Sequence, residues 1–285
     1  MKEQHIKTSL GIFFGILTAC TMVVVATLIQ LSVGVHSEVL VFFRNFLGLL
    51  IIFPIVYFKK IPFTFSLVKA NFIRAIMGLG AMYCYFFALQ HLSLVDAVLL
   101  QNTIPLFVPL VLWFWMKKKI RHIRMFPLLI GFIGVLIILK PTRGILDWYS
   151  VIGLTSGLLG AIALVGVKEL TRTQSSLSIL FYYFVISSAI SFIPSIALWE
   201  PIVSVKIWVY AIAAGLIGIV YQVFLTLSFK HLLATQASSM MYLSLIFSGL
   251  ADWWILGFTP AMSSIIGAAL VMIGGVWVLL LAPSR

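Results

Sequence analysis

The chain has 285 residues, of which 62% are hydrophobic and 9% charged, with a mean hydropathy of +1.18 and a formal net charge of +12. Soluble domains are about 45–50% apolar and about 25% charged, so no aqueous core could bury this much apolar surface. The composition therefore excludes a soluble enzyme. It predicts an integral membrane protein that contacts lipid and no nucleic acid, because the basic residues lie in short loops between apolar runs.

Apolar runs of membrane-spanning length follow one another through the whole chain. A transmembrane helix needs about 20 apolar residues, and its backbone satisfies its own hydrogen bonds in lipid. The runs are too long for the alternating strands of about 10 residues that build a barrel. We therefore expect an all-α integral membrane fold. Ten spans are predicted, near residues 9–31, 38–58, 71–90, 95–116, 125–139, 149–167, 176–198, 207–229, 232–255 and 262–281.

The basic residues predict the orientation of these spans. With ten spans and a cytoplasmic N-terminus, 15 of the 19 Lys and Arg residues fall inside, three fall outside, and Arg44 falls within a span. Cytoplasmic loops of membrane proteins carry an excess of Lys and Arg. We therefore expect both termini in the cytoplasm.

The two halves of the chain resemble each other at an offset of 140 residues. His91-Leu92 matches His231-Leu232, and Gly78 matches Gly218. Five spans per half would make the halves enter the membrane in opposite directions, as in the inverted repeats of many secondary transporters. The alternative is chance similarity between apolar helices. The predicted repeats are residues 1–145 and 146–285.

Arg44 lies a turn or two below the predicted outer end of the second span. A cation at that depth costs about 2.5–3.5 kcal/mol on insertion scales, so it should face a cavity or a partner. Its guanidinium would attract an anionic or zwitterionic substrate. The alternatives are that Arg44 extends to the outer headgroups, or that it pairs with Glu38, Asp96 or Asp252.

The fourth span contains Gln101, Asn102, Pro105 and Pro109. Proline has no N–H, so the carbonyls four residues before Pro105 and Pro109 lose their helical partners and the helix should bend. Free backbone acceptors at this depth face water, another helix or a ligand. Together with the two amides, they predict that this helix lines the substrate pathway. A structural kink stabilised by neighbouring helices is the alternative.

Further aromatic and amide residues could line the same pathway. Tyr83, Phe87 and Gln90 share one face of the third span, Gln222 lies in the eighth span, and Tyr242 lies in the ninth. Aromatic rings and amides suit an organic metabolite, which needs stacking area and directional hydrogen bonds. We select Tyr83, Gln222 and Tyr242 as candidates. Ordinary helix packing is the alternative for each of them.

Catalytic and metal chemistry find no support in the sequence. The five histidines are dispersed among loops and span ends, and both cysteines lie in the middle of spans. No Walker loop is present, and no carboxylate lies in the middle of a span. We therefore expect no enzyme activity, no cofactor and no metal.

Four groups of residues follow one another in the first half of the chain. They are Phe43-Arg44-Asn45-Phe46, Phe86-Phe87-Ala88-Leu89 leading to Leu92-Ser93-Leu94-Val95-Asp96-Ala97, Ile104-Pro105-Leu106-Phe107, and Gly131-Phe132-Ile133-Gly134-Val135. In this order and spacing, the chain resembles the EamA family of the drug/metabolite transporter superfamily over essentially its whole length. Two departures are Lys117-Lys118-Lys119, where members often have a Gly-Glu pair, and Leu245, where the second half usually has a proline.

The resemblance implies a ten-helix carrier with both termini inside and a central cavity formed by helices of both halves. Known members move small organic solutes such as amino acids, nucleotide-like metabolites, S-adenosylmethionine or drugs. Phe43-Arg44 and the run from Asn102 to Phe107 look most similar to the S-adenosylmethionine-uptake subgroup. The family and the short loops also point to a bacterial inner membrane, with the chain as a monomer or a homodimer.

These observations together predict a secondary transporter that moves a small organic metabolite by alternating access. Arg44 would attract charge, Asn102 and Gln222 would orient the solute, and Tyr83 and Tyr242 would stack on it. Two other classes stay open. One is a membrane sensor or scaffold that transports nothing, since fold does not fix function. The other is an intramembrane enzyme, although no paired acids or serine-base arrangement supports it.

Overall fold

The computed structural model describes residues 2–61, 68–117, 125–139, 148–200, 204–257 and 261–280. All secondary structure in these ranges is helical, which confirms the predicted all-α class. Seven helices in these ranges are long and apolar enough to cross a membrane, with mean hydropathies between 1.6 and 2.5. They coincide with the predicted first to fourth and sixth to eighth spans.

The first half of the chain contains six helices. The fourth predicted span is made of two of them, α4 and α5, and the fifth is the 15-residue helix α6. The bounds are α1 Lys2–Leu31, α2 Ser37–Phe58, α3 Val68–His91, α4 Leu94–Gln101, α5 Ile104–Met116 and α6 Met125–Leu139.

The helices of the second half follow the same order as those of the first. The ninth span predicted for the chain is divided into four short segments. The predicted ninth and tenth spans are therefore shorter or more broken than a regular 20-residue helix. The bounds are α7 Trp148–Leu170, α8 Ser176–Ala197, α9 Val205–His231, α10 Ala234–Ser239, η4 Met240–Tyr242, α11 Leu243–Ala251, the π-helix η5 Asp252–Leu256, and α12 Met262–Leu280.

The breaks in the two halves occur at corresponding positions. Helix α4 ends at Gln101 and α5 begins at Ile104, just before Pro105. Proline has no backbone N–H and cannot donate a helical hydrogen bond. In the second half a 3₁₀ turn interrupts the helix at Met240–Tyr242, without any proline. The Asn102 side chain donates a 2.6 Å hydrogen bond to Ser244 Oγ, so the two breaks are joined directly.

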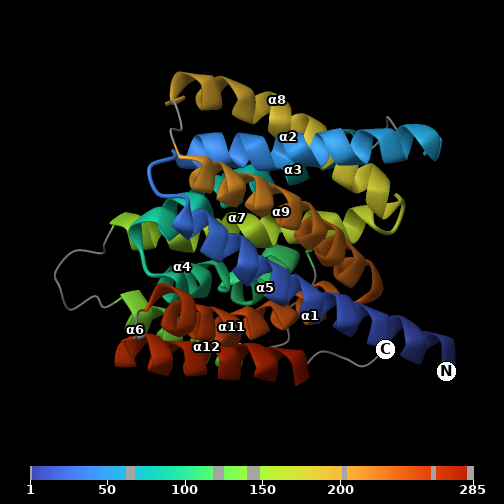
Figure 1. The fold of residues 1–285 in the computed structure, drawn as a ribbon. Helices are drawn as coiled ribbons and strands as arrows, with labels where there is room; N and C mark the ends of the chain where they lie inside the picture. Colours follow the sequence, from blue (N-terminus) through green and yellow to red (C-terminus); the bar gives the residue numbers. More distant parts are fainter. Residues whose placement is uncertain are drawn as a thin grey trace.

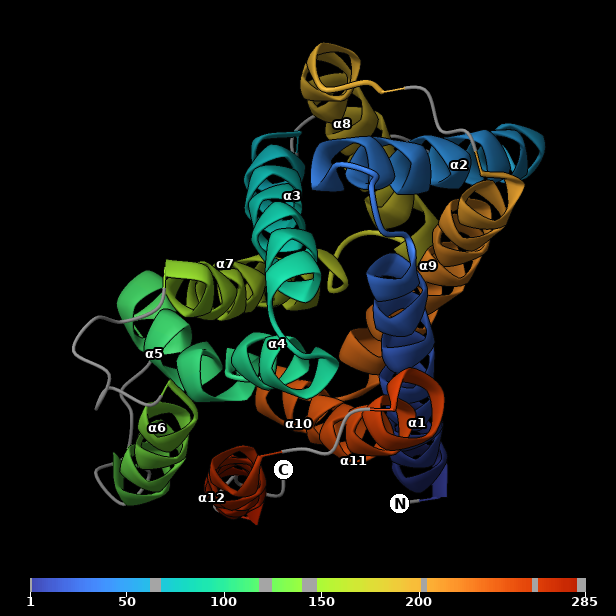
Figure 2. The same cartoon turned by 60° about the vertical axis from the view of Figure 1, so that its left-hand side comes forward.

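The helix contacts are nearly symmetric between the two halves: replacing each helix by its counterpart in the other half gives nearly the same set of contacts. Helix α1 packs on α9 and α3 packs on α7, while α2 packs on α8 and α6 on α12. Figures 1 and 2 show α2 with α8 at one edge of the molecule and α6 with α12 at the opposite edge. The other helices lie between these two pairs, so the centre of the molecule is built from both halves.

The contact between α6 and α12 repeats itself at the offset of 140 residues. A Cβ on Gly134 would lie 2.7 Å from the Gly267 carbonyl oxygen, and a Cβ on Gly274 would lie 2.6 Å from the Pro127 carbonyl oxygen. Adding 140 to 134 and 127 gives 274 and 267. Each glycine therefore allows the two backbones to approach closely, as small residues do in membrane helix pairs.

The outer surface of the helices is apolar. Phe53, Ile193, Val205 and Trp254 are each more than half exposed, and many other large apolar side chains are also exposed. Such a surface is unfavourable in water but suits lipid tails. Together with the seven long apolar helices, it supports an integral membrane protein.

Candidate functional site

A cavity that holds several buried polar side chains lies at the centre of the helices. Its walls come from α1, α2, α3, α4, α5, α7, α8 and α9, and its volume is about 80 Å³. A water molecule needs about 10–15 Å³ on this measure, and ligand pockets typically measure about 300–1,000 Å³. The cavity is therefore narrow in this conformation. Its polar lining consists of Arg44, Arg74, Tyr85, Gln101, Tyr183, Tyr221 and Gln222.

Arg44 extends from α2 into this cavity. It is 5% exposed, and its guanidinium donates to the Met82 sulfur and, at 3.4 Å, to the Gly218 carbonyl. Sulfur is a weak acceptor, and Nε has no partner among the described residues. A Cβ on Gly218 would lie 2.4 Å from Nε. The glycine on α9 thus makes room for the arginine.

Arg74 extends from α3 into the same cavity. It is 3% exposed, and its Cζ atom lies 3.9 Å from the centre of the Tyr183 ring on α8. Its Nε and Nη1 atoms have no hydrogen-bond partner among the described residues. Cation–π stacking stabilises the charge but leaves these N–H groups unsatisfied.

The two buried cations have no acidic partner within 4.0 Å in the described ranges. Glu38 accepts a hydrogen bond from Ser37, and Asp96 accepts one of 2.6 Å from Ser264. Each cation in the membrane costs about 2.5–3.5 kcal/mol on insertion scales. Arg44 is thus neither paired with Glu38 or Asp96 nor extended to the headgroups, and the charge in the cavity is uncompensated.

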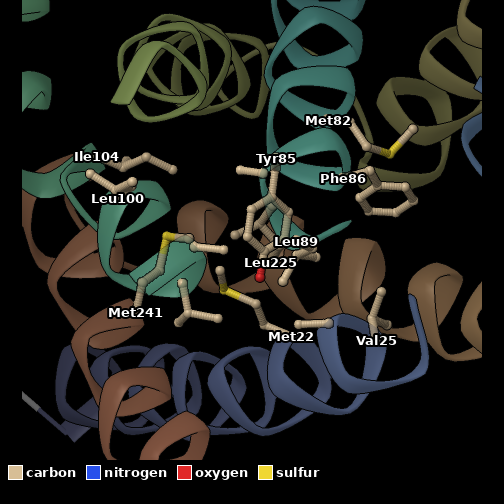
Figure 3. Packing of buried hydrophobic residues seen from close by; sticks show 14 of the residues in the cluster. Met22, Val25, Met82, Tyr85, Phe86, Leu89, Leu100, Ile104, Leu225 and Met241 are labelled. Carbon is tan, nitrogen blue, oxygen red and sulfur yellow. The ribbon is translucent and has the colours of Figure 1, made fainter. Parts of the chain in front are cut away.

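Neutral polar groups complete the lining. Gln101 accepts a hydrogen bond from Ser156 of α7, whereas the side-chain oxygens of Gln222 and Tyr85 have no partner in the part of the chain that the structure describes. Figure 3 shows Tyr85 extending from α3 toward Met22 of α1 and Leu225 of α9. Buried polar groups in proteins are normally hydrogen-bonded, so several unsatisfied ones around one cavity indicate a ligand site.

The structure brings together half of the predicted site residues. Arg44, Gln101 and Gln222 line the cavity. Of the others, Asn102 and the buried Tyr242 belong to the two helix breaks, and Tyr83 lies on another face of α3. Solute binding by all six residues stays a prediction. Of the predicted kink residues, Pro105 lies directly after the break between α4 and α5, and Pro109 lies inside α5.

Sequence reasoning missed Arg74 because it counted this residue among the cytoplasmic loop cations. The predicted third span, 71–90, already contained it near one end, and in the structure α3 begins at Val68, so Arg74 lies well inside the helix. It shares a face with Gly78, Ala81 and Tyr85, at i+4, i+7 and i+11, and all four line the cavity. That spacing was the signal that could have identified it.

Polar contacts join the helices at both ends of the molecule. At the end that the charge pattern places outside, Gln90 donates to the Val35 carbonyl at 2.7 Å and Gln30 donates to that of Leu92 at 3.4 Å. At the opposite end, Lys168 of α7 donates to the Phe229 carbonyl of α9 at 2.9 Å. The first set connects α1 and α3, and the second connects the corresponding helices α7 and α9.

An uncompensated cationic cavity, enclosed by apolar helices of both halves, defines a membrane protein of the solute-transporter class. Such sites lie where two repeats meet. The chain belongs to the EamA-like transporter family, whose model matches residues 9–140 and 147–280. The predicted family is therefore confirmed.

Named relatives of the chain are also transporters. The chain is 27% identical over 268 residues to the pseudopaline exporter CntI of Pseudomonas aeruginosa, with 92% of this chain and 93% of the relative covered. It is 24% identical over 243 residues to the S-adenosylmethionine uptake transporter of Rickettsia prowazekii, with 85% and 82% covered. These names confirm the prediction of a transporter rather than an enzyme.

One solved crystal structure is similar in fold. It is 19% identical in sequence and superposes with a TM-score of 0.66, covering 97% of both chains. At this identity the likeness shows the fold alone. It supports the arrangement of the helices along the whole chain.

Proposed function

We propose that the protein is a secondary transporter that moves a small organic metabolite by alternating access, with the central cavity as its solute site. The observation that carries this proposal is the cavity itself, which both halves enclose and which holds unsatisfied polar atoms of Arg44, Arg74 and Gln222. The relatives are named for different solutes, one an exporter and one an uptake transporter, so neither solute nor direction is taken from them.

The proposed topology is ten spans in two inverted five-helix repeats, residues 1–145 and 146–285. Three observations support it: the helix contacts that persist when the halves are exchanged, the glycine contacts of α6 and α12, and the separate match of each half to one family model. The basic loops favour cytoplasmic termini, and the bacterial relatives favour a bacterial inner membrane.

We assign roles to the predicted site residues according to their places in the structure. Arg44 attracts an anionic group of the solute, while Gln101 and Gln222 orient it by hydrogen bonding. Asn102 and its bond to Ser244 hold the two helix breaks together, where free backbone groups lie at membrane depth. Tyr83 and Tyr242 lie outside the cavity lining, and we propose no solute contact for them in this conformation.

The first test is uptake and counterflow in proteoliposomes, using labelled amino acids, nucleotides and S-adenosylmethionine with the native chain and Arg44→Gln. We expect saturable uptake of one solute, accelerated by the same solute on the far side. The variant should lower its rate about 10- to 100-fold, because a hydrogen bond to a charged group contributes about 1.5–3 kcal/mol.

The amount of inserted, monodisperse protein is the control for this test. Equal flux from native and variant protein would contradict the role of Arg44. Binding of a solute without any flux would favour the sensor class, and chemical conversion of a solute in detergent would favour the enzyme class. In both cases the transporter proposal fails.

A second prediction concerns the contacts that close the two ends. Lys168→Met removes the bond to Phe229, and Gln90→Leu removes the bond to Val35, while both changes keep a side chain of similar length. We expect Lys168→Met to expose the cavity to the cytoplasm and Gln90→Leu to expose it to the outside, because each variant loses a contact that joins the helices at that end in this conformation.

The measurement is labelling of a cysteine placed at the cavity residue Ala163, in a chain from which Cys20 and Cys84 have been removed. A membrane-impermeant maleimide is added from one side of oriented vesicles. Labelling should rise about threefold or more on opposite sides for the two variants, since a population shift of this size needs only about 0.7 kcal/mol. A rise on the same side for both would contradict separate gates.

A further inference from the structure

We propose that the cavity binds a solute with two anionic groups, one held by Arg44 and the other by Arg74, on either side of an apolar or aromatic middle. This inference rests on the proposed transport function and adds the class of its substrate. It also assigns a solute-binding role to Arg74, which the structure places in the cavity lining.

The two guanidinium groups occupy different walls of the cavity. Arg44 projects from α2 and lies against α9, with its Nη2 atom 3.4 Å from the Gly218 carbonyl. Arg74 projects from α3 and lies against α8, with its guanidinium stacked on Tyr183. An elongated solute with an anionic group at each end could contact both walls at once.

Both groups have unused hydrogen-bond donors. Arg44 keeps Nε free and uses a weak sulfur acceptor, and Arg74 keeps Nε and Nη1 free, among the described residues. A guanidinium carries five N–H donors in a planar fork that matches carboxylate or phosphate oxygens. Each arginine can therefore take an anionic group of its own.

The charge in the cavity calls for two negative charges. No carboxylate in the described ranges lies within 4.0 Å of either arginine, so a neutral solute would leave two buried cations uncompensated and a monoanion would leave one. A dianion neutralises both. It therefore gains most from the site.

Much of the cavity lining beside the two arginines is apolar or aromatic. The Met82 sulfur accepts from Arg44 and also lies 3.9 Å from the hydroxyl of Tyr183, the residue on which Arg74 stacks. Phe86 lies beside Arg44, with its ring centre 5.9 Å from the guanidinium carbon. Carbon or ring atoms between the two anionic groups of the solute would contact these side chains.

The test compares solutes that share a skeleton but differ in charge. The probes are the straight-chain dicarboxylates of four to eight carbons and terephthalate, each with its monoamide and its neutral diamide. Binding to the detergent-purified full-length chain is measured by thermal stabilisation. We expect at least one dicarboxylate to bind about tenfold or more tightly than its monoamide, because the monoamide loses one charged contact, and we expect the diamide not to bind.

Arg74→Gln should remove this preference. In that variant the affinity for the dicarboxylate should fall to that of the monoamide, whose own affinity should change less than about twofold, since one anionic group still meets Arg44. Arg74→Lys keeps the charge and should restore part of the difference, which also shows that the site folds. Arg172→Gln is the matched control, because Arg172 is exposed and pairs with Glu169 at 2.9 Å, outside the cavity.

The outcomes separate this inference from the proposed function. Equal binding of dicarboxylates and diamides in every series, or an Arg74→Gln variant that leaves the preference intact, would overturn the two-anion site. Flux of a neutral or monoanionic solute that Arg74→Gln does not change would also overturn it, while leaving the transporter proposal intact. Tight, charge-dependent binding without any flux would support the site and contradict the transporter.

Discussion

Replacing Gly218 by leucine should lower transport about a hundredfold or more, with little loss of inserted protein. A Cβ at this position would lie 2.4 Å from Arg44 Nε and 3.0 Å from its Cδ. The leucine would therefore displace the guanidinium from the wall of the cavity. Misplacing a binding group by about 1 Å can cost about 100-fold in rate. The measurement is the initial rate of solute uptake in proteoliposomes.

Gly249→Leu is the matched control for this variant. Gly249 lies in α11 with nothing within 4 Å of an added Cβ, so the same substitution there meets no neighbour. We expect it to transport at close to the native rate. Native transport by Gly218→Leu would show that Arg44 can act from another position, and equal loss in both variants would show a general effect of leucine.

Replacing Gly134 by leucine should destabilise the protein by about 3 kcal/mol, near the upper end of the usual range for overpacking. The added side chain would meet backbone atoms of α12, the Gly267 carbonyl oxygen at 2.7 Å and the Val271 nitrogen at 2.9 Å. A backbone clash cannot be relieved by a change of side-chain rotamer, so the two helices must separate.

Thermal unfolding in detergent measures this effect. A loss of about 3 kcal/mol corresponds to a fall in Tm of roughly 6–12 °C for a chain of this size. Gly274→Leu should give a similar fall in Tm, because Gly274 of α12 is the counterpart of Gly134 and packs against the backbone of Pro127 and Gly131 in α6. An unchanged Tm for both variants would contradict the close contact of α6 with α12.

Most of the fold could be predicted because lipid imposes a simple rule. Backbone groups in a bilayer are satisfied within helices, so apolar length alone located the seven long spans, including Leu94–Trp115. The second-half break was harder to predict, since no proline marks Met240–Tyr242. There the irregular backbone packs on α1, and its position matches the break between α4 and α5.

The site was only partly predictable, because a helix near the midplane reveals its inward face through spacing rather than residue type. Arg44 stood out as a charge inside a predicted span. Arg74 also lies inside a predicted span, 71–90, but near its start, and the charge pattern explained it equally well as a cytoplasmic cation. The partners of both arginines, Gly218 and Tyr183, come from the other half of the chain and appear only when the helices are packed.

The uncompensated charge of the cavity also bears on the membrane voltage. With no described carboxylate beside Arg44 or Arg74, the cavity offers these arginines no counter-charge that travels with the solute. A dianion that crosses alone then carries two charges through the field, which amounts to about 4.6 kcal/mol at 100 mV, or roughly 2,000-fold in concentration ratio. Across any membrane whose cytoplasmic side is negative, this voltage favours outward movement of the two-anion solute proposed above, because the charge that crosses is the charge of the solute.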